Sequence, residues 1–281
     1  MFWVSATKGS AFISGKVWLS KSYVIALLFL VGWRGDCMTA MALNDLATPQ
    51  GPVASESRFE SAAPRRLPPL TSVILVDDAQ QLDHIGDPRI SLALWRRGFD
   101  PKIERAVAGL PTERLLNGRI ALGSTETQAQ CMARLQDLLQ EHAVEPAGLG
   151  WWLADMAMLA ELFNGLVKRT LGPRPITARV ETLDRVSCPR FHVDRTGLRL
   201  LCTYRGLGTE WLPNEEIDRS ALANRQPNEV IQHGSQPRAL QPFWVGLFKG
   251  ECFPGNAGRG QVHRSPAVPP DDLRVLFCLD A

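Results

Sequence analysis

The part of the chain that most restricts its fold lies after Pro175 and consists of short strand-like runs. Runs rich in Val, Ile, Thr and aromatic residues alternate there with turn clusters such as Gly206-Leu207-Gly208. Several short strands separated by turn residues are typical of a β-sandwich or a jelly roll. We therefore predict an α+β fold whose C-terminal part is a β jelly roll. Strands are expected at residues 176–183, 191–194, 198–204, 243–248, 261–265 and 273–279.

The residues before this region are predicted to form mainly helices that support it. Thr125-x-x-Gln128 resembles a capping box, and apolar residues then recur at helical spacing until about residue 142. Residues 150–169 are apolar on nearly every side, which indicates a helix buried against a sheet, and Pro173 follows its end. Two short strands are expected before these helices, at residues 72–76 and 90–95.

The domain organisation follows from a change in composition near residue 70. Residues 47–69 are rich in Pro, Ala, Ser and Arg and show no apolar period, which is typical of a linker or a disordered tail. We predict an N-terminal apolar segment and linker at 1–69 and a single globular domain at 70–281. Within that domain, 70–175 would be mainly helical support and 176–281 the jelly-roll, metal-binding region.

The apolar run at residues 23–33 has two interpretations. It follows several lysines and precedes Ala40-Met41-Ala42, which is the general layout of a secretory signal, although a membrane-spanning helix needs about 20 apolar residues. The other interpretation is that translation starts at Met38 or Met41. We favour this second reading, which predicts a cytoplasmic protein without membrane association. An exported or membrane-anchored protein is the alternative if the segment at 23–33 is retained.

Charge and cysteine content restrict the partners. The 31 basic and 29 acidic residues give a net charge of +2, so the sequence shows no basic stripe or excess that would indicate nucleic-acid binding. The six cysteines form no Cys-x-x-Cys pair, which favours free thiols in a reducing compartment. The substrate, a small molecule or a protein, is not defined by the sequence.

Three residues of the strand-rich region are candidate metal ligands. His192 and Asp194 are two residues apart in an expected strand, so their side chains should point to the same side. His263 lies at the front of another expected strand, and strands distant in sequence become neighbours in a jelly roll. Two imidazoles and one carboxylate are the donors that hold a divalent iron on one face and leave other positions open.

Arginines near the end of the chain are candidates for binding a carboxylate. On the last expected strand Arg274 alternates with apolar residues and is the only cation of its face. A guanidinium that points into a pocket holds a carboxylate in bidentate fashion. Arg264, next to His263, is also a candidate for this role. It ranks below Arg274 because its side chain should point away from that of His263.

This pattern resembles the iron(II)- and 2-oxoglutarate-dependent oxygenases of the double-stranded β-helix fold. The segment LLCTYRGLGTEWL at 200–212 is similar to the strand and turn that follow the His-x-Asp in prolyl-hydroxylase-like members. The resemblance implies that His192, Asp194 and His263 bind Fe(II). It further implies that Arg274 binds the distal carboxylate of 2-oxoglutarate and that Tyr204 hydrogen-bonds this cosubstrate. The implied reaction couples decarboxylation of 2-oxoglutarate to hydroxylation of a substrate C–H bond.

A second resemblance covers more of the chain. The stretches at 188–194, 200–212 and 262–266 are similar to a proteobacterial family known as domain of unknown function 1826, over roughly residues 70–281. This resemblance supports the boundary at the linker and implies no established activity.

Two other classes of function remain open from the sequence. A zinc-dependent hydrolase on a cupin-like site would use Asp194 or Glu210 as a base toward a metal-bound water. Cys188 would favour zinc if it were a further, soft ligand, because thiolates prefer that metal. A metal-binding accessory protein without catalysis would keep the histidines and would not need Arg274.

Overall fold

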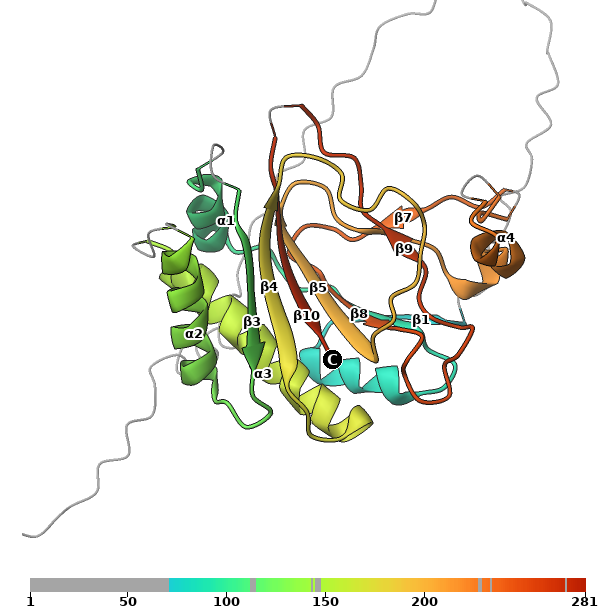
Figure 1. The fold of residues 1–281 in the computed structure, drawn as a ribbon, viewed down its shortest axis with the longest axis horizontal. Helices are drawn as coiled ribbons and strands as arrows, with labels where there is room; N and C mark the ends of the chain where they lie inside the picture. Colours follow the sequence, from blue (N-terminus) through green and yellow to red (C-terminus); the bar gives the residue numbers. More distant parts are fainter. Residues whose placement is uncertain are drawn as a thin grey trace, which may run out of the picture. The chain divides into compact units, whose positions relative to one another are not determined.

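Two β-sheets of different size form the framework of the protein (Figure 1). A computed structural model describes residues 71–111, 115–142, 144, 148–226, 229–232, 234–270 and 272–281. The apolar segment and linker at 1–69 lie outside the described residues, and the domain boundary expected there stays a prediction.

The large sheet has seven strands in the order β1-β2-β8-β5-β10-β4-β3. Its strands are antiparallel to their neighbours except for the parallel pair β1 and β2. Three of them, β1 (Val73–Val76), β2 (Leu92–Trp95) and β3 (Asn117–Leu122), come from the N-terminal half. The other four are β4 (Ile176–Leu183), β5 (Leu198–Arg205), β8 (Val245–Lys249) and β10 (Arg274–Asp280).

The small sheet consists of β7 (Arg238–Ala239), β6 (Glu210–Trp211) and β9 (His263–Arg264). His192 extends this sheet by a single antiparallel bridge to β9. From β4 onward the chain alternates between the two sheets. Strands β4, β5, β8 and β10 belong to the large sheet, and the segments between them supply His192, then β6 and β7, and then β9 to the small sheet. This alternation is the jelly roll, or double-stranded β-helix, that the sequence predicts, and the α+β fold is confirmed.

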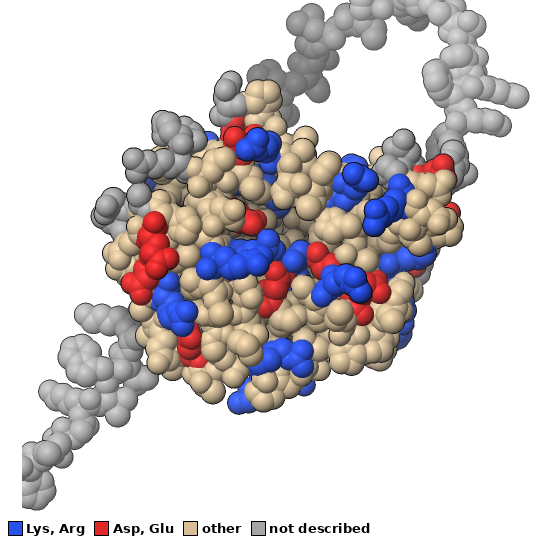
Figure 2. All heavy atoms as spheres, viewed as in Figure 1, with Lys and Arg blue, Asp and Glu red and all other residues tan. Residues whose placement is uncertain are grey.

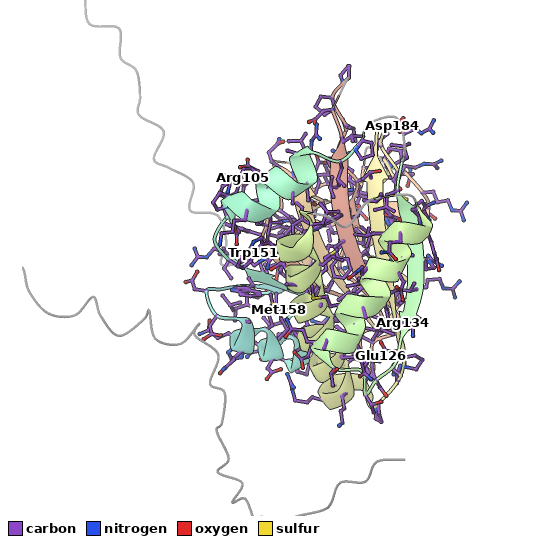
Figure 3. The ribbon with its side chains drawn as sticks, turned by 90° about the vertical axis from the view of Figure 1, so that its left-hand side faces the viewer. Arg105, Glu126, Arg134, Trp151, Met158 and Asp184 are labelled. Carbon is purple, nitrogen blue, oxygen red and sulfur yellow. The ribbon has the colours of Figure 1, made fainter. Side chains whose placement is uncertain are left out.

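Helices cover the face of the large sheet that points away from the small sheet (Figures 1 and 3). They are α1 (Pro101–Ala108), α2 (Gln128–Glu141) and α3 (Gly150–Leu171), with the 3-10 helix η3 (Ala79–Gly86) beside them. The shorter η4 (Asn214–Glu216) and α4 (Arg219–Ala223) follow β6. Ten side chains of α3 are buried, as expected for a helix packed against a sheet.

The alternation of side chains along each strand gives the large sheet two chemically different faces. On β10, Val275, Phe277 and Leu279 join the core beneath the helices, while the alternate residues point toward the small sheet. The interior between the sheets combines apolar residues with buried charged ones such as Arg274. A polar chamber therefore lies inside the roll, while most of the apolar packing is on the helical side.

The structure corrects several local expectations. Thr127 and Gln130 form the capping box of α2, not Thr125 and Gln128, because the same Thr-x-x-Gln spacing occurs twice with an offset of two residues. The expected strand at 191–194 is reduced to the single bridge at His192. The region 70–175 also supplies three strands to the large sheet, so it is more than helical support.

Strand β3 and helix α1 were not expected from the sequence. In β3, Gly118 lies so close to Leu138 of α2 that an added Cβ would be 2.8 Å from the Leu138 side chain. The position thus requires a residue without a side chain, although glycine in a strand obscures the sequence pattern. In α1, Asp100 caps the first turn by accepting the Lys102 N–H at 2.8 Å.

A buried ion pair ties the large sheet to α3. Arg97 donates two hydrogen bonds to Asp155, at 2.6 and 2.7 Å, and their side chains are 10% and 12% exposed. Tyr204 of β5 donates a third hydrogen bond to Asp155 at 2.6 Å. Removing one member of a buried pair leaves an uncompensated charge, which costs far more than losing an exposed pair.

We predict that Asp155→Asn lowers the free energy of unfolding by about 3–5 kcal/mol, because Arg97 is left without a counter-charge. Tyr204→Phe should cost about 1 kcal/mol, the net value of one hydrogen bond. Asp83→Asn is the control, since its pair with Arg169 is more than half exposed and should contribute less than about 1 kcal/mol. Urea unfolding followed by circular dichroism measures all three, and equal losses for Asp155→Asn and Asp83→Asn would contradict the argument.

Candidate metal centre

Backbone pairing brings the two candidate histidines together. The N–H of His192 donates to the carbonyl of His263 at 3.0 Å, and the N–H of His263 donates back to the carbonyl of His192 at 3.0 Å. Residues paired in this way stand directly opposite each other, with their side chains on the same face of the sheet. Their ring centroids are 4.5 Å apart. Two histidines that are 71 positions apart in sequence are thus joined by one reciprocal pair of hydrogen bonds.

Both imidazole rings are oriented by a backbone carbonyl two residues earlier. The Nδ1 of His192 lies 2.9 Å from the Arg190 carbonyl, and the Nδ1 of His263 lies 3.1 Å from the Gln261 carbonyl. A carbonyl accepts only, so each Nδ1 must carry the proton of its hydrogen bond. The neutral rings then present an unprotonated Nε2, as metal-binding histidines usually do.

Asp194 completes the cluster. Its carboxylate lies 3.2 Å from Nε2 of His263 and 3.8 Å from Nε2 of His192. One potential ligand atom from each of the three residues lies within 4.8 Å of the others. His263 is 4% exposed and rests against the ring of Phe248, with centroids 5.1 Å apart. The three side chains that the sequence singled out therefore meet around one point.

Arg199 of β5 holds the carboxylate of Asp194 in place. Its Nη1 lies 2.6 Å from Oδ2 of Asp194, while its Nε donates to Asp280 at 2.5 Å. Asp280 also accepts from Arg179 at 3.2 Å, so the carboxylate is one end of a chain of alternating charges. Figure 2 shows basic and acidic side chains side by side across the middle of this face of the molecule.

The electrostatics of the cluster keep Asp194 ionised. Burial alone would raise its pKa, but the neighbouring His263 and the charge of Arg199 lower the pKa to about 2. Burial, together with the neighbouring His263, lowers the pKa of His192 below its ordinary value. At neutral pH both residues are thus in the forms that bind metals.

The donor set fits a divalent metal ion. The Oδ2 of Asp194 is buried and accepts no well-aligned hydrogen bond within the described part of the chain, although Arg199 is close. A buried carboxylate oxygen that lacks a hydrogen bond is costly unless it coordinates an ion. Two imidazole nitrogens and one carboxylate oxygen on a single face match the arrangement that binds non-haem Fe(II) and leaves open positions for other ligands.

Arg274 shares the interior with the three candidate ligands. Its Nε donates to the Leu207 carbonyl at 2.9 Å, and its Nη2 donates to the Thr209 hydroxyl at 2.8 Å. The residue is 2% exposed, and burial lowers its pKa to about 10. Among the described residues no carboxylate forms an ion pair with it, although Glu181 lines the same cavity and raises the pKa of Arg274 in part.

A small cavity of about 80 Å³ connects these groups. Its lining includes His192, His263, Arg199, Thr209 and Arg274. A larger hollow of about 780 Å³ lies on the helical side, between α1 and the start of α3, where Figure 3 labels Arg105 and Trp151. That hollow contains none of the candidate ligands, so the smaller cavity is the chemically relevant one.

Two residues expected near the cosubstrate lie elsewhere. Tyr204 is on the opposite face of β5 and bonds Asp155 beneath the helices, so its expected contact with a cosubstrate is wrong. The reason is strand parity: Arg199 and Thr203 face the cavity, and the even-numbered Tyr204 cannot. Arg264 points out of the cavity and forms an ion pair with Glu210 at 2.6 Å, as its parity relative to His263 requires.

Sequence reasoning missed two participants, Arg199 and Thr209. Arg199 follows Asp194 by five residues, and its parity on β5 relative to Leu201 would have placed it inside the roll. Thr209 follows the turn at Gly208, where an added Cβ would lie 1.9 Å from the Leu240 carbonyl. No pattern in the sequence reveals that Thr209 meets Arg274.

Fold and site together define a jelly-roll protein with a His-x-Asp and distal His cluster inside the roll. The chain belongs to the family described as "Protein of unknown function (DUF1826)", whose model matches residues 76–280. No curated protein is significantly similar to the chain in sequence. Within the described part of the chain, no helix combines the length and hydrophobicity needed to cross a bilayer.

Several solved structures resemble the chain weakly. Dioxygenase for auxin oxidation 1 from Arabidopsis thaliana, in complex with 2-oxoglutarate, is 13% identical with a TM-score of 0.41, covering 74% of this chain and 91% of that chain. The rice dioxygenase for auxin oxidation is 17% identical with a TM-score of 0.43, covering 74% and 81%. Neurospora crassa T7H, in complex with alpha-KG and thymine, is 12% identical with a TM-score of 0.38, covering 74% and 84%. The strand order, not these similarities, defines the fold.

We predict that His192→Ala, Asp194→Ala and His263→Ala each weaken metal binding by roughly 100-fold or more, because each removes one of three ligands. Isothermal titration with Fe(II) under nitrogen, or with Mn(II) in air, measures the affinity. His84→Ala, at an exposed histidine of η3, is the matched control and should bind like the wild type. Unchanged affinity in the Asp194 variant would contradict the three-ligand site.

A second prediction concerns the stability of the metal-free protein at low pH. The pKa of Asp194 is lowered from 3.8 to about 2, so its ionised form stabilises the fold above pH 4 and this contribution disappears as the pH falls toward 2. The difference between wild type and Asp194→Asn should therefore shrink by about 2 kcal/mol between pH 5 and pH 2. Chemical unfolding at several pH values measures it, and a difference that is constant with pH would be inconsistent with the lowered pKa.

Proposed function

We propose that the protein is a mononuclear non-haem iron enzyme that uses 2-oxoglutarate and dioxygen to hydroxylate a substrate. His192, Asp194 and His263 would hold Fe(II), and Arg274 would bind the distal carboxylate of 2-oxoglutarate. The observation that carries this proposal is the unpaired, buried Arg274 in the same cavity as the three candidate ligands.

The charge of Arg274 supports an anionic ligand. Burying a guanidinium without a counter-charge is unfavourable, and the lowered pKa of Arg274 reflects that cost. The hydroxyl of Thr209 and the carbonyl of Leu207 fix the direction of the guanidinium. A carboxylate placed against it would accept charge-assisted hydrogen bonds in a site with little water. A dicarboxylic acid would then reach from Arg274 toward the metal centre.

The atoms of the proposed reaction balance with 2-oxoglutarate as the one organic cosubstrate. 2-Oxoglutarate, dioxygen and a substrate C–H give succinate, carbon dioxide and a substrate C–OH, with one oxygen atom going to each organic product. Fe(II), when held by His192, Asp194 and His263, would supply the open coordination positions and the redox chemistry needed to activate dioxygen. The protein binds and orients the reactants: Arg199 keeps Asp194 ionised, and the two Nδ1 hydrogen bonds keep each Nε2 directed at the centre.

The structure gives less support to a zinc hydrolase. Glu210, one of the two bases considered for such an enzyme, is ion-paired with Arg264 at 2.6 Å and does not line the cavity. Asp194 is itself within the ligand cluster and is held by Arg199. Cys188 lines the cavity and is exposed, but it is not part of the group that meets within 4.8 Å. A non-catalytic metal-binding role would not explain why Arg274 is buried without an ion-pair partner among the described residues.

The first test is metal analysis of protein purified without oxygen, followed by an assay of 2-oxoglutarate conversion to succinate. We expect one iron per chain and slow succinate formation even without the substrate, as uncoupled turnover. Stoichiometric zinc with no turnover after iron reconstitution would overturn the proposal.

We predict that Arg274→Ala abolishes saturable 2-oxoglutarate binding while it leaves Fe(II) binding within about threefold of wild type, because Arg274 is not a ligand. Arg274→Lys should recover only part of the affinity, since a lysine cannot pair with a carboxylate in bidentate fashion. Arg264→Gln, next to His263 but outside the cavity, is the matched control. The absorption band of the Fe(II)–2-oxoglutarate complex reports binding, and its persistence in Arg274→Ala would contradict the assignment.

A further inference from the structure

A second hollow, of about 510 Å³, is lined by His192 and by its two neighbours in the chain, Phe191 and Val193. It shares that imidazole with the smaller cavity, which it exceeds several-fold in volume. The cavity of about 80 Å³ has room for little beyond a small polar molecule, so a larger reactant must bind beside it. Pockets for small organic molecules measure about 300–1,000 Å³, and the second hollow falls in that range.

The floor of this hollow is apolar. Phe191, Val193, Leu222 and Val230 line it, and all four belong to one hydrophobic cluster between the His192 segment and α4. Val193 takes part because residues alternate in direction along the chain, so that it points away from His192 and Asp194. In Figure 1, α4 lies at the end of the small sheet, away from helices α1 to α3.

The rim of the hollow is basic. Arg190, Arg195 and Arg225 line it and are exposed. Within the described residues, none of their guanidinium groups forms an ion pair or a hydrogen bond. The acidic group of the lining, Glu251, is occupied by the N–H groups of Gly258 and Gly260, at 2.7 and 3.0 Å. The hollow therefore carries three cations against one carboxylate that is already engaged.

The backbone at Arg225 adds an independent observation. Its φ of 57° is in the left-handed region, directly after the end of α4. Glycine is the residue that takes this position without strain at the end of a helix, so an arginine there is held at a cost. Strain of this kind is concentrated where a side chain is needed for binding. Arg225, the strained residue at this helix end, is thus one of the three arginines that line the hollow.

We propose that this hollow binds the organic substrate, and that the substrate is a small amphipathic acid with an apolar body and a carboxylate. The apolar body would lie on Phe191 and Val193, next to His192, and the carboxylate would be held at the rim by Arg225 and Arg195. This inference rests on the proposed function for the claim that the bound acid is the molecule oxidised, but the binding site itself does not depend on it.

The test uses 4-phenylbutyrate and its uncharged analogue 4-phenylbutan-1-ol as probes of the metal-free, full-length protein. Titration calorimetry should show the acid binding roughly tenfold tighter than the alcohol, with an affinity that falls as salt is added. Arg225→Gly and Arg195→Gln should each weaken the acid by roughly threefold or more and leave the alcohol unchanged. Arg119→Gln, at an exposed arginine of β3, is the control and should bind like the wild type.

Arg225→Gly separates loss of charge from loss of fold. Glycine relieves the left-handed strain, so the melting temperature should stay equal to or rise above that of the wild type while acid binding falls. Equal affinities for acid and alcohol, or the same loss in Arg119→Gln, would overturn the proposal. So would binding of acidic peptides without binding of the small acid, which would indicate a protein substrate.

A separate measurement tests how close the probe lies to the metal centre. With Mn(II) in the metal site, the proton signals of 4-phenylbutyrate should broaden, and Arg225→Gly should reduce this effect at the same probe concentration. Arg274→Ala should leave acid binding intact. Acid binding without 2-oxoglutarate turnover would overturn the proposed function and keep the hollow, and turnover without acid binding would do the reverse.

Discussion

The site depends on one pair of backbone hydrogen bonds, those exchanged between His192 and His263. Because directly paired residues in antiparallel strands project to the same face, this single bridge sets the spacing of the two imidazoles before any metal is considered. The flanking carbonyls of Arg190 and Gln261 then fix the rings, so each Nε2 is directed inward. A shift of one residue in this pairing would place the two rings on opposite faces of the small sheet.

The interior of the roll is built to hold charge, in contrast to the core under the helices. Asp194, Arg199, Asp280 and Arg179 alternate in sign along the inner face of the large sheet. Arg274 stands apart from this chain of pairs because no described carboxylate forms an ion pair with it. On this inner face, four largely buried charges are paired and the buried guanidinium of Arg274 is not, which leaves a position that an anion can fill. This contrast is the physical basis for assigning a carboxylate ligand to the cavity.

The organisation around His192 also suggests how two reactants are kept apart. This residue lines both a small polar cavity and a larger hollow with an apolar floor. Residue alternation produces this arrangement directly, since His192 and Asp194 face the cluster while Val193 faces the hydrophobic cluster near α4. Under the proposed function, the cosubstrate and the organic substrate would therefore bind on different surfaces beside one centre.

Much of this protein was readable from its sequence. Runs of β-branched residues between turn residues identify the strands, and the spacing of His192, Asp194, His263 and Arg274 identifies the side chains that meet, because strand alternation is a local property. Sequence alone did not separate Tyr204 from Arg274, because the pairing of β5 with β10 shifts register between Val275 and Leu276. The position of the capping box was ambiguous because the same motif occurs twice, offset by two residues.

Tertiary structure alone decided which distant residues become neighbours. The register that pairs His192 with His263, the approach of Thr209 to Arg274, and the position of α4 over Val193 result from how the two sheets close on each other. No local pattern encodes these contacts, because their free energy comes from packing and hydrogen bonding between segments far apart in the chain. Local sequence patterns show which groups are available for chemistry, and the closing of the roll sets which of them share a cavity.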